Sequence, residues 1–155
     1  MDCMVDDRRF MDLALAQAAA AAEIGEVPVG AVVVFEGEVI SQAHNRRELD
    51  ADPTAHAELI AMRDAAKEIG DWRLEECTVY VTLEPCAMCA GLMVNARVKR
   101  CVYAAADPRG GFLGTLGDLS SHPVLNHRFE VTAGIRAEEA AETLRAFFRK
   151  VRNKK

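Results

Sequence analysis

The sequence lacks any apolar run long enough to span a bilayer. Its N-terminal residues are acidic, and they contain no hydrophobic segment of the kind found in a signal peptide. Its five cysteines are an odd number, which argues against a disulfide framework. These absences predict a cytoplasmic protein with no membrane partner. In such a setting a Cys-x-x-Cys motif points to metal binding or redox chemistry rather than to a disulfide.

An excess of positive charge is also missing. The net charge is −5 over 155 residues, so the molecule as a whole does not resemble a nucleic-acid-binding protein. Segment 143–155, however, contains six basic residues and no acidic one. Its cations fit a solvated helix end, where they complement the helix dipole, or a contact with a polyanion. The sequence alone favours the helix end but leaves both interpretations open.

No repeat, linker or change of composition marks a domain boundary, so we expect residues 1–155 to form one domain. Apolar periodicity and turn residues predict helices over 7–24, 53–69, 86–96 and 137–150, and strands over 29–35, 38–43, 77–83, 100–105 and 129–133. Asp52 or Thr54 is the expected cap of the second helix. Because strands joined through helices run parallel, the pattern predicts an α/β fold with three α/β/α layers and a five-stranded mixed sheet.

Two short segments carry the chemistry, His56-Ala57-Glu58 and Cys86-Ala87-Met88-Cys89. They offer one imidazole and two thiols as metal ligands. Three protein ligands leave one position of a tetrahedral zinc ion open for water, and a nearby carboxylate can move the protons of that water. The segments therefore predict a hydrolytic zinc centre with Glu58 as the proton-transfer group, although iron or cobalt would also bind such ligands.

The spacing of these residues suggests where the metal lies. Cys86 and Cys89 face the same way on a helix, whereas His56 and Glu58 point about 200° apart around one. His56 and Glu58 can both reach a metal only if it lies just beyond the N-terminus of their helix. We therefore expect the zinc between two helix N-termini, one opened by Pro53 and the other by Pro85. The partial positive charge of helix N-termini stabilises thiolates.

Three other interpretations compete with a catalytic metal. Cys77 or Cys101 would make the site structural by adding a fourth ligand, although lone cysteines in strands are usually buried apolar residues. Cys86 and Cys89 would form a redox dithiol if His56 and Glu58 had no role. His56 taken alone would be a hydrogen-bonded core histidine.

The H-x-E and P-C-x-x-C pair is the documented signature of the zinc-dependent nucleobase deaminases, together with their mechanism. The sequence around it closely resembles the bacterial tRNA-specific adenosine deaminases from about residue 8 to residue 150. The resemblance rests on segments 26–31 (EVPVGA), 52–58 (DPTAHAE), 82–91 (TLEPCAMCAG) and 122–127 (HPVLNH). It implies a cytidine-deaminase-like fold, one zinc ion per subunit and a homodimer. It also implies conversion of adenosine to inosine at the wobble base of the tRNA(Arg) anticodon loop.

In the family that the sequence resembles, zinc-activated water attacks C6 of a flipped-out adenine. The residues that match its zinc ligands are His56, Cys86 and Cys89, and Glu58 matches its proton shuttle. The residues that match or resemble its substrate contacts are Val29, Asn45, Asp107, Phe147, Phe148 and Arg149.

Some of these substrate contacts have a simpler alternative. Asn45 would hydrogen-bond the adenine, or only end a hairpin strand, and the two roles are compatible. Val29 would be a wall of the base pocket or a plain strand residue, and Asp107 would meet a neighbouring ribose hydroxyl. Phe147 or Phe148 would pack near the flanking bases, although we expect one of them to be core. Arg149 would lie along the phosphate backbone.

Two further hypotheses stay open. A deaminase of a free base or nucleoside, such as guanine, cytosine or cytidine, would use identical zinc chemistry, and a basic C-terminal helix favours RNA over it. A non-catalytic zinc-binding module would need no Glu58. Segments 46–49 and 107–112 do not match the family at every residue, which leaves recognition beyond the target base open.

Overall fold

The computed structural model describes the backbone of residues 3–154 and the side chains of residues 6–154. Met1, Asp2 and Lys155, which belong to the predicted domain, lie outside the described residues. The helices are α1 (Cys3–Glu23), α2 (Ala57–Ile69), α3 (Ala87–Asn95) and α4 (Ala137–Asn153). The strands are β1 (Gly30–Phe35), β2 (Glu38–His44), β3 (Cys77–Leu83), β4 (Arg100–Ala105) and β5 (Glu130–Ala133).

The five strands form one mixed sheet in the order β2-β1-β3-β4-β5. β1 runs antiparallel to both β2 and β3, while β3, β4 and β5 are parallel to one another. β2 and β3, which are joined through α2, therefore point the same way, as do β3 and β4, which are joined through α3. The predicted α/β fold with a five-stranded mixed sheet is confirmed.

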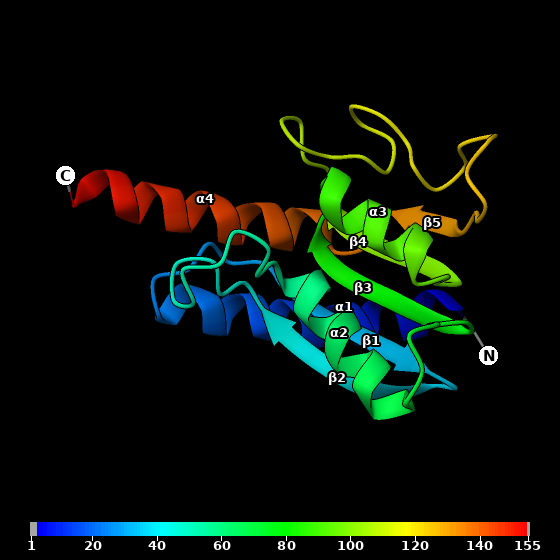
Figure 1. Ribbon diagram of the computed structural model, residues 1–155. Helices are drawn as coiled ribbons and strands as arrows, with labels where there is room; N and C mark the ends of the chain where they lie inside the picture. Colours follow the sequence, from blue (N-terminus) through cyan, green and yellow to red (C-terminus); the bar gives the residue numbers. More distant parts are fainter. Residues whose placement is uncertain (1–2, 155) are drawn as a thin grey trace.

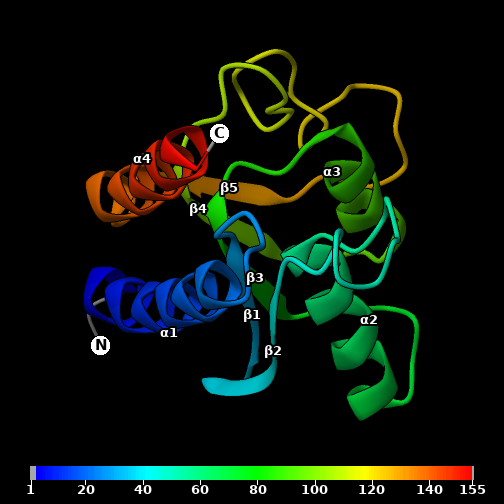
Figure 2. The same ribbon diagram turned by 90° about the vertical axis from the view of Figure 1, so that its left-hand side faces the viewer.

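Helices cover both faces of the sheet, with α1 and α4 on one side and α2 and α3 on the other (Figures 1 and 2). The strands supply both cores because alternate residues point to opposite faces. Val33 and Val79 pack toward α2 and α3, whereas Val32 and Val102 pack toward α1 and α4. Strands buried on both faces read as continuous apolar runs, which explains why the sequence shows them so clearly.

The start of α2 differs from the prediction. The helix begins at Ala57, and neither Asp52 nor Thr54 caps it. Instead, the Asp52 carboxylate accepts hydrogen bonds from the Thr54 N–H (2.8 Å) and the Thr54 hydroxyl (2.7 Å). These bonds close a turn that resembles a helix cap in sequence, because the same side chains favour both structures. Pro53 therefore does not open α2.

Other boundaries shift less. The first helix starts four residues before the predicted Asp7, and α4 continues past Lys150 to Asn153. The segment between β4 and β5 is irregular apart from one isolated bridge between Leu113 and Asp118. Within residues 3–154, every helix is too short or too polar to cross a membrane.

Candidate active site

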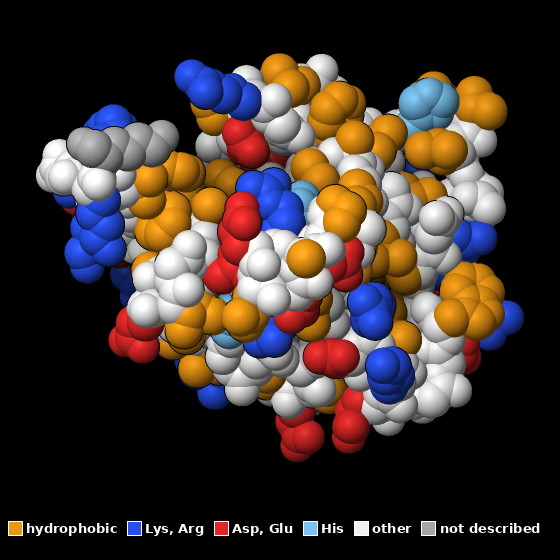
Figure 3. Space-filling model, turned by 60° about the vertical axis from the view of Figure 1, so that its left-hand side comes forward, with side chains coloured by type: hydrophobic (Ala, Val, Ile, Leu, Met, Phe, Trp, Pro, Cys, Tyr) orange, Lys and Arg blue, Asp and Glu red, His pale blue; other side chains and the backbone are white. Residues whose placement is uncertain are grey.

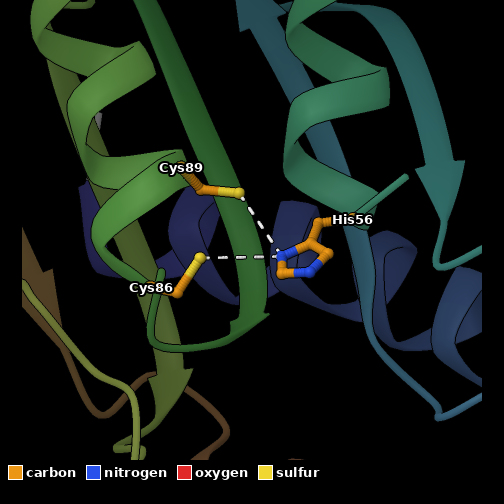
Figure 4. Close-up of side chains that lie close together, drawn as sticks. All are labelled: His56, Cys86 and Cys89. Atoms are coloured by element: carbon orange, nitrogen blue, oxygen red, sulfur yellow. Dashed lines mark hydrogen bonds between the residues drawn. The ribbon is translucent and has the colours of Figure 1, made fainter. Parts of the chain in front are cut away.

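Two helix N-termini converge on one side of the sheet and bring three metal-binding side chains together. His56 is the N-cap residue of α2 and Cys86 is the N-cap residue of α3, both with extended backbone. Cys89 follows in the first turn of α3. Because an N-cap residue lies outside the regular helix, its side chain can turn beyond the helix end. Figure 4 shows all three side chains directed toward one point between the helices.

The spacing of these atoms suits a tetrahedral metal. The His56 Nδ1 atom lies 3.7 Å from the Cys86 Sγ atom and 3.6 Å from the Cys89 Sγ atom. Zinc with Zn–S bonds of about 2.3 Å and Zn–N bonds of about 2.1 Å would separate tetrahedral sulfur and nitrogen ligands by about 3.6 Å. The three residues therefore fit a zinc ion by donor type and by distance.

A fourth protein ligand is absent from this cluster. Among the side chains of residues 6–154, the only group of three or more potential donors that could hold a metal is His56, Cys86 and Cys89. Cys77 and Cys101 are buried in the apolar core on strands β3 and β4. The cluster thus lacks the closed ligand set of a structural zinc site.

The thiols of Cys86 and Cys89 differ in pKa. A hydrogen bond with Cys89, followed by one with His56, lowers the pKa of Cys86 to about 3. The hydrogen bond to Cys86 and burial raise the pKa of Cys89. A metal binds cysteine as thiolate, so an ion held by both sulfurs must displace any proton that the pair carries.

Glu58 lies in the first turn of α2 and is 4% exposed. Burial raises the pKa of its carboxyl to about 7, although the nearby His56 charge and hydrogen bonds oppose this shift. A group with a pKa near the working pH can both take up and release a proton. Glu58 is therefore suited to proton transfer beside the cluster.

A pocket of about 180 Å³ opens over this group. Besides His56, Glu58 and Cys86, the residues that line it are Val27, Val29, Asn45, Arg47, Ala57, Leu83, Glu84 and Asp107. Asn45 follows β2 directly and also braces the chain: its amide donates to the Val27 carbonyl (3.3 Å) and accepts from the Arg47 N–H (3.1 Å). Three of the sequence-predicted substrate contacts, Val29, Asn45 and Asp107, thus lie in the wall of one pocket.

The other three predicted contacts lie elsewhere, on the outer turns of α4. Phe148 and Arg149 line a separate surface groove of about 610 Å³, which Arg109 of the β4–β5 loop also lines. Phe147 packs its ring edge-on against Phe148, with centroids 5.3 Å apart. The expectation that one phenylalanine belongs to the core is wrong: Phe147 is only half-buried and Phe148 is 44% exposed.

The outer turns of α4 explain this exposure, because they extend past the sheet (Figure 1). Figure 3 shows hydrophobic side chains gathered along this projecting end, with Lys and Arg side chains beside them. Arg149 pairs with Glu142 of the same helix at 2.9 Å. Exposed apolar and basic groups on one helix end form a surface suited to a partner with both bases and phosphates.

Sequence reasoning assigned no role to three residues of this pocket region. Arg47 and Glu84 line the pocket, and Glu26 lies behind the loop that carries Arg47. Glu26 and Glu84 are both almost completely buried. The sequence does contain a signal for the two glutamates, since each is a single carboxylate in a mostly apolar segment that also contains proline. Glu26 lies in EVPVGA and Glu84 lies in TLEPC. A buried charge in such a place needs several hydrogen-bond donors.

This arrangement defines a class of proteins. One histidine and two cysteines at helix N-termini, a buried glutamate beside them and a three-layer α/β/α fold together characterise the nucleobase deaminases. The MafB19-like deaminase family matches residues 5–152 of the chain.

The relatives narrow the class. The chain is 49% identical over 152 residues to the tRNA-specific adenosine deaminase of Bacillus subtilis, covering 98% of this chain and 94% of the relative. A solved structure from studies of A-to-I editing by tRNA:A34 deaminases has a TM-score of 0.85 and 43% identity, covering 88% of this chain and 99% of that one. The protein belongs to the family of tRNA-specific adenosine deaminases.

A more distant solved structure shares the fold alone. The guanine deaminase of Nitrosomonas europaea has a TM-score of 0.77 at 24% identity, with 90% of this chain and 83% of that one covered. The same scaffold therefore occurs in a deaminase that acts on a free base, and substrate choice must come from the surroundings of the pocket.

Proposed function

We propose that this protein is a zinc-dependent deaminase that converts adenosine to inosine at the wobble position of tRNA(Arg). The observation that carries the proposal is the cluster of His56, Cys86 and Cys89 beside the buried Glu58, at one pocket. The 49% identity to a protein named tRNA-specific adenosine deaminase supports the choice of substrate.

His56, Cys86 and Cys89 would hold the zinc ion. When bound, zinc supplies a Lewis acid that lowers the pKa of water toward neutrality. Glu58 takes a proton from the water that attacks C6 and delivers it to the N1 atom of adenine. It then takes the remaining proton from the hydroxyl group added at C6 and gives it to the amino group, which leaves as ammonia. Adenosine and one water thereby become inosine and ammonia, and the raised pKa of Glu58 suits both transfers.

Substrate recognition would use two surfaces. In the pocket, Asn45 would hydrogen-bond the flipped-out adenine, Val29 would pack against it, and Asp107 would meet a neighbouring ribose hydroxyl. Outside the pocket, Phe148 with Phe147 would contact flanking bases, and Arg149 would contact phosphate. An anticodon loop suits this arrangement because its bases are unpaired and cost little to flip. Arg109, which lines the α4 groove and lies two residues from Asp107, links the two surfaces.

The proposal includes a homodimer in the cytoplasm, which the family resemblance implies. Exposed apolar side chains support an interface with a second copy: Met88 on α3 is 37% exposed, and Val124 in the segment between β4 and β5 is 83% exposed. Light scattering of the purified protein tests this part, and a mass equal to one chain at micromolar concentration would contradict it.

The substrate is tested by a panel of candidates. The purified protein is incubated with a tRNA(Arg) anticodon stem-loop that carries adenine at the wobble position, and separately with free adenosine, cytidine, cytosine and guanine. We expect inosine from the stem-loop alone. Turnover of guanine, cytosine or cytidine without turnover of the stem-loop would instead identify a deaminase of free bases or nucleosides. If no substrate reacts while zinc remains bound, the protein is a non-catalytic zinc-binding module.

A further inference from the structure

Two buried carboxylates beside the pocket have no part in the chemistry described above. Glu84, directly after β3, is 2% exposed, and Glu26, before β1, is 1% exposed. Burying a carboxylate is unfavourable unless several donors satisfy it. Each of these residues accepts hydrogen bonds from the backbone of a distant loop, and each loop contributes one residue to the pocket lining, Arg47 or Asp107.

The Glu84 carboxylate is the centre around which the 107–115 loop folds. Its Oε1 atom accepts hydrogen bonds from the Asp107 N–H (3.0 Å) and the Thr115 hydroxyl (2.5 Å). Its Oε2 atom accepts from the N–H groups of Leu113 (3.0 Å) and Thr115 (3.1 Å). The loop approaches so closely that a Cβ atom on Gly111 would lie 2.3 Å from the Glu84 carboxyl carbon. Glycine is required at 111 for this contact.

We infer that Glu84 is a positioning residue for substrate binding. Asp107 is the residue of the 107–115 loop that lines the pocket, and its backbone N–H is bonded to Glu84. The Asp107 carboxylate accepts from the N–H groups of Arg109 (3.0 Å) and Gly110 (3.2 Å), so its orientation depends on the same loop. Glu84 thereby holds Asp107 in the pocket wall. This inference rests on the proposed function, in which Asp107 contacts the nucleotide beside the target base.

A Glu84→Gln substitution isolates the bond to Asp107. The glutamine side chain keeps one oxygen and replaces the other with an NH₂ donor. In the Oε2 position, this group would face two backbone N–H donors, from Leu113 and Thr115. In the Oε1 position, it can donate to the Thr115 hydroxyl, which rotates to accept. The NH₂ group therefore takes the Oε1 position, and the variant loses the Asp107 bond while keeping both bonds at Oε2.

The experiment compares the zinc-loaded wild type with Glu84→Gln, Asp107→Ala and the double variant. We expect Glu84→Gln to raise KM for the stem-loop about tenfold with kcat within about twofold, since one hydrogen bond is lost outside the reacting centre. Zinc content should stay at the wild-type level, and amide hydrogen exchange at Asp107 should accelerate. In the Asp107→Ala background, Glu84→Gln should change KM by less than about twofold, because both changes remove the same contact.

Glu26→Gln is the matched control, because it also changes a buried carboxylate at the pocket. Its partners are the N–H groups of Glu48 (3.0 Å) and Leu49 (2.9 Å), so exchange at Asp107 should remain at the wild-type rate. If Glu84→Gln does not fold, Gly111→Ala is used instead, because its Cβ atom would displace the Glu84 carboxyl. We expect the same changes in KM and in amide exchange at Asp107.

Two results would overturn the inference. One is an unchanged rate of amide hydrogen exchange at Asp107 in Glu84→Gln. The other is a double variant whose increase in KM equals the product of the increases in Glu84→Gln and Asp107→Ala. A wild-type protein that does not turn over the stem-loop would contradict the proposed function instead. The exchange measurement would still test the Glu84–Asp107 bond in that case.

Discussion

The metal cluster and the outer end of α4 contrast in how they are held. Cys89 and Glu58 are almost completely buried, and the cluster is fixed by the points where two helices start. The outer turns of α4 extend past the sheet, and among the described residues Arg145 and Arg149 form ion pairs with glutamates one or two turns away on the same helix. One region is positioned by the core of the protein, and the other by its own helix.

The difference separates two tasks of the proposed enzyme. Proton transfer and metal binding require atoms held within fractions of an ångström, which a buried helix start can provide. Contact with a flexible RNA loop tolerates exposed side chains, because stacking and phosphate contacts need less exact geometry. Changes in the buried cluster should therefore reduce turnover, whereas changes on α4 should weaken substrate binding.

The largest effect is expected from removing a metal ligand. Cys86→Ala should lose its zinc and all detectable inosine formation on the stem-loop, because the reaction needs the Lewis acid. Metal analysis and a deamination assay measure both losses. Cys77→Ala is the matched control, since it removes a buried cysteine outside the cluster and should retain zinc. Substantial turnover by metal-free Cys86→Ala would contradict the assignment.

The next largest effect is expected from a substitution that removes proton transfer but not metal binding. Glu58→Gln keeps the shape of the side chain but cannot carry the proton, so kcat should fall about 10²–10⁴-fold while zinc content is unchanged. Glu68→Gln, on the exposed part of the same helix, should behave like the wild type. If Glu58→Gln retained wild-type kcat, the interpretation of the cluster as a proton-transfer site would be wrong.

The same contrast explains what the sequence could predict. The order of strands and helices was readable because the strands are buried on both faces and give unbroken apolar runs. The contact between His56 and Cys86 could be predicted from motif spacing, because the spacing within each segment places its metal ligands at a helix N-terminus. The start of α2 was not readable, because the Asp52–Thr54 turn uses the same residues as a helix cap.

Outside the metal motif, contacts between distant segments could not be predicted from the sequence. The bonds from Glu84 to the 107–115 loop cross 23 to 31 residues, and a single carboxylate gives no hint of its partners. The exposure of Phe148 depends on α4 extending beyond the sheet, which periodicity does not reveal. Amphipathic spacing marks an apolar helix face but does not say whether protein covers it.

A smaller effect should follow from changing α4. Phe148→Ala should raise KM for the stem-loop about tenfold and leave kcat nearly unchanged, because stacking of one base on an aromatic ring contributes about 1–3 kcal/mol. Trp72→Ala is a matched control: Trp72 is 55% exposed and lines neither the pocket nor the α4 groove. Equal effects of the two substitutions, or a loss confined to kcat, would remove the distinction between the two regions.

The smallest effect on activity should come from the ion pair that ties α1 to the sheet. The Asp7 carboxylate accepts hydrogen bonds from Arg100 (2.7 and 2.8 Å) and from the Tyr80 hydroxyl (2.7 Å). Burial alone would raise the pKa of Asp7, but these bonds and the Arg100 charge hold the pKa of this carboxyl below its usual range. Asp7→Asn should reduce the free energy of unfolding by about 2 kcal/mol at pH 7 and leave kcat unchanged.

The pH dependence tests the role of the ionised carboxylate. A lowered carboxyl pKa stabilises the fold only while the group is ionised. The difference in unfolding free energy between wild type and variant should therefore stay constant from pH 7 to about pH 5 and shrink as the pH falls through the pKa of folded Asp7. Urea unfolding at several pH values measures it, and a difference that already shrinks between pH 7 and about pH 5 would show that Asp7 is not held in this way.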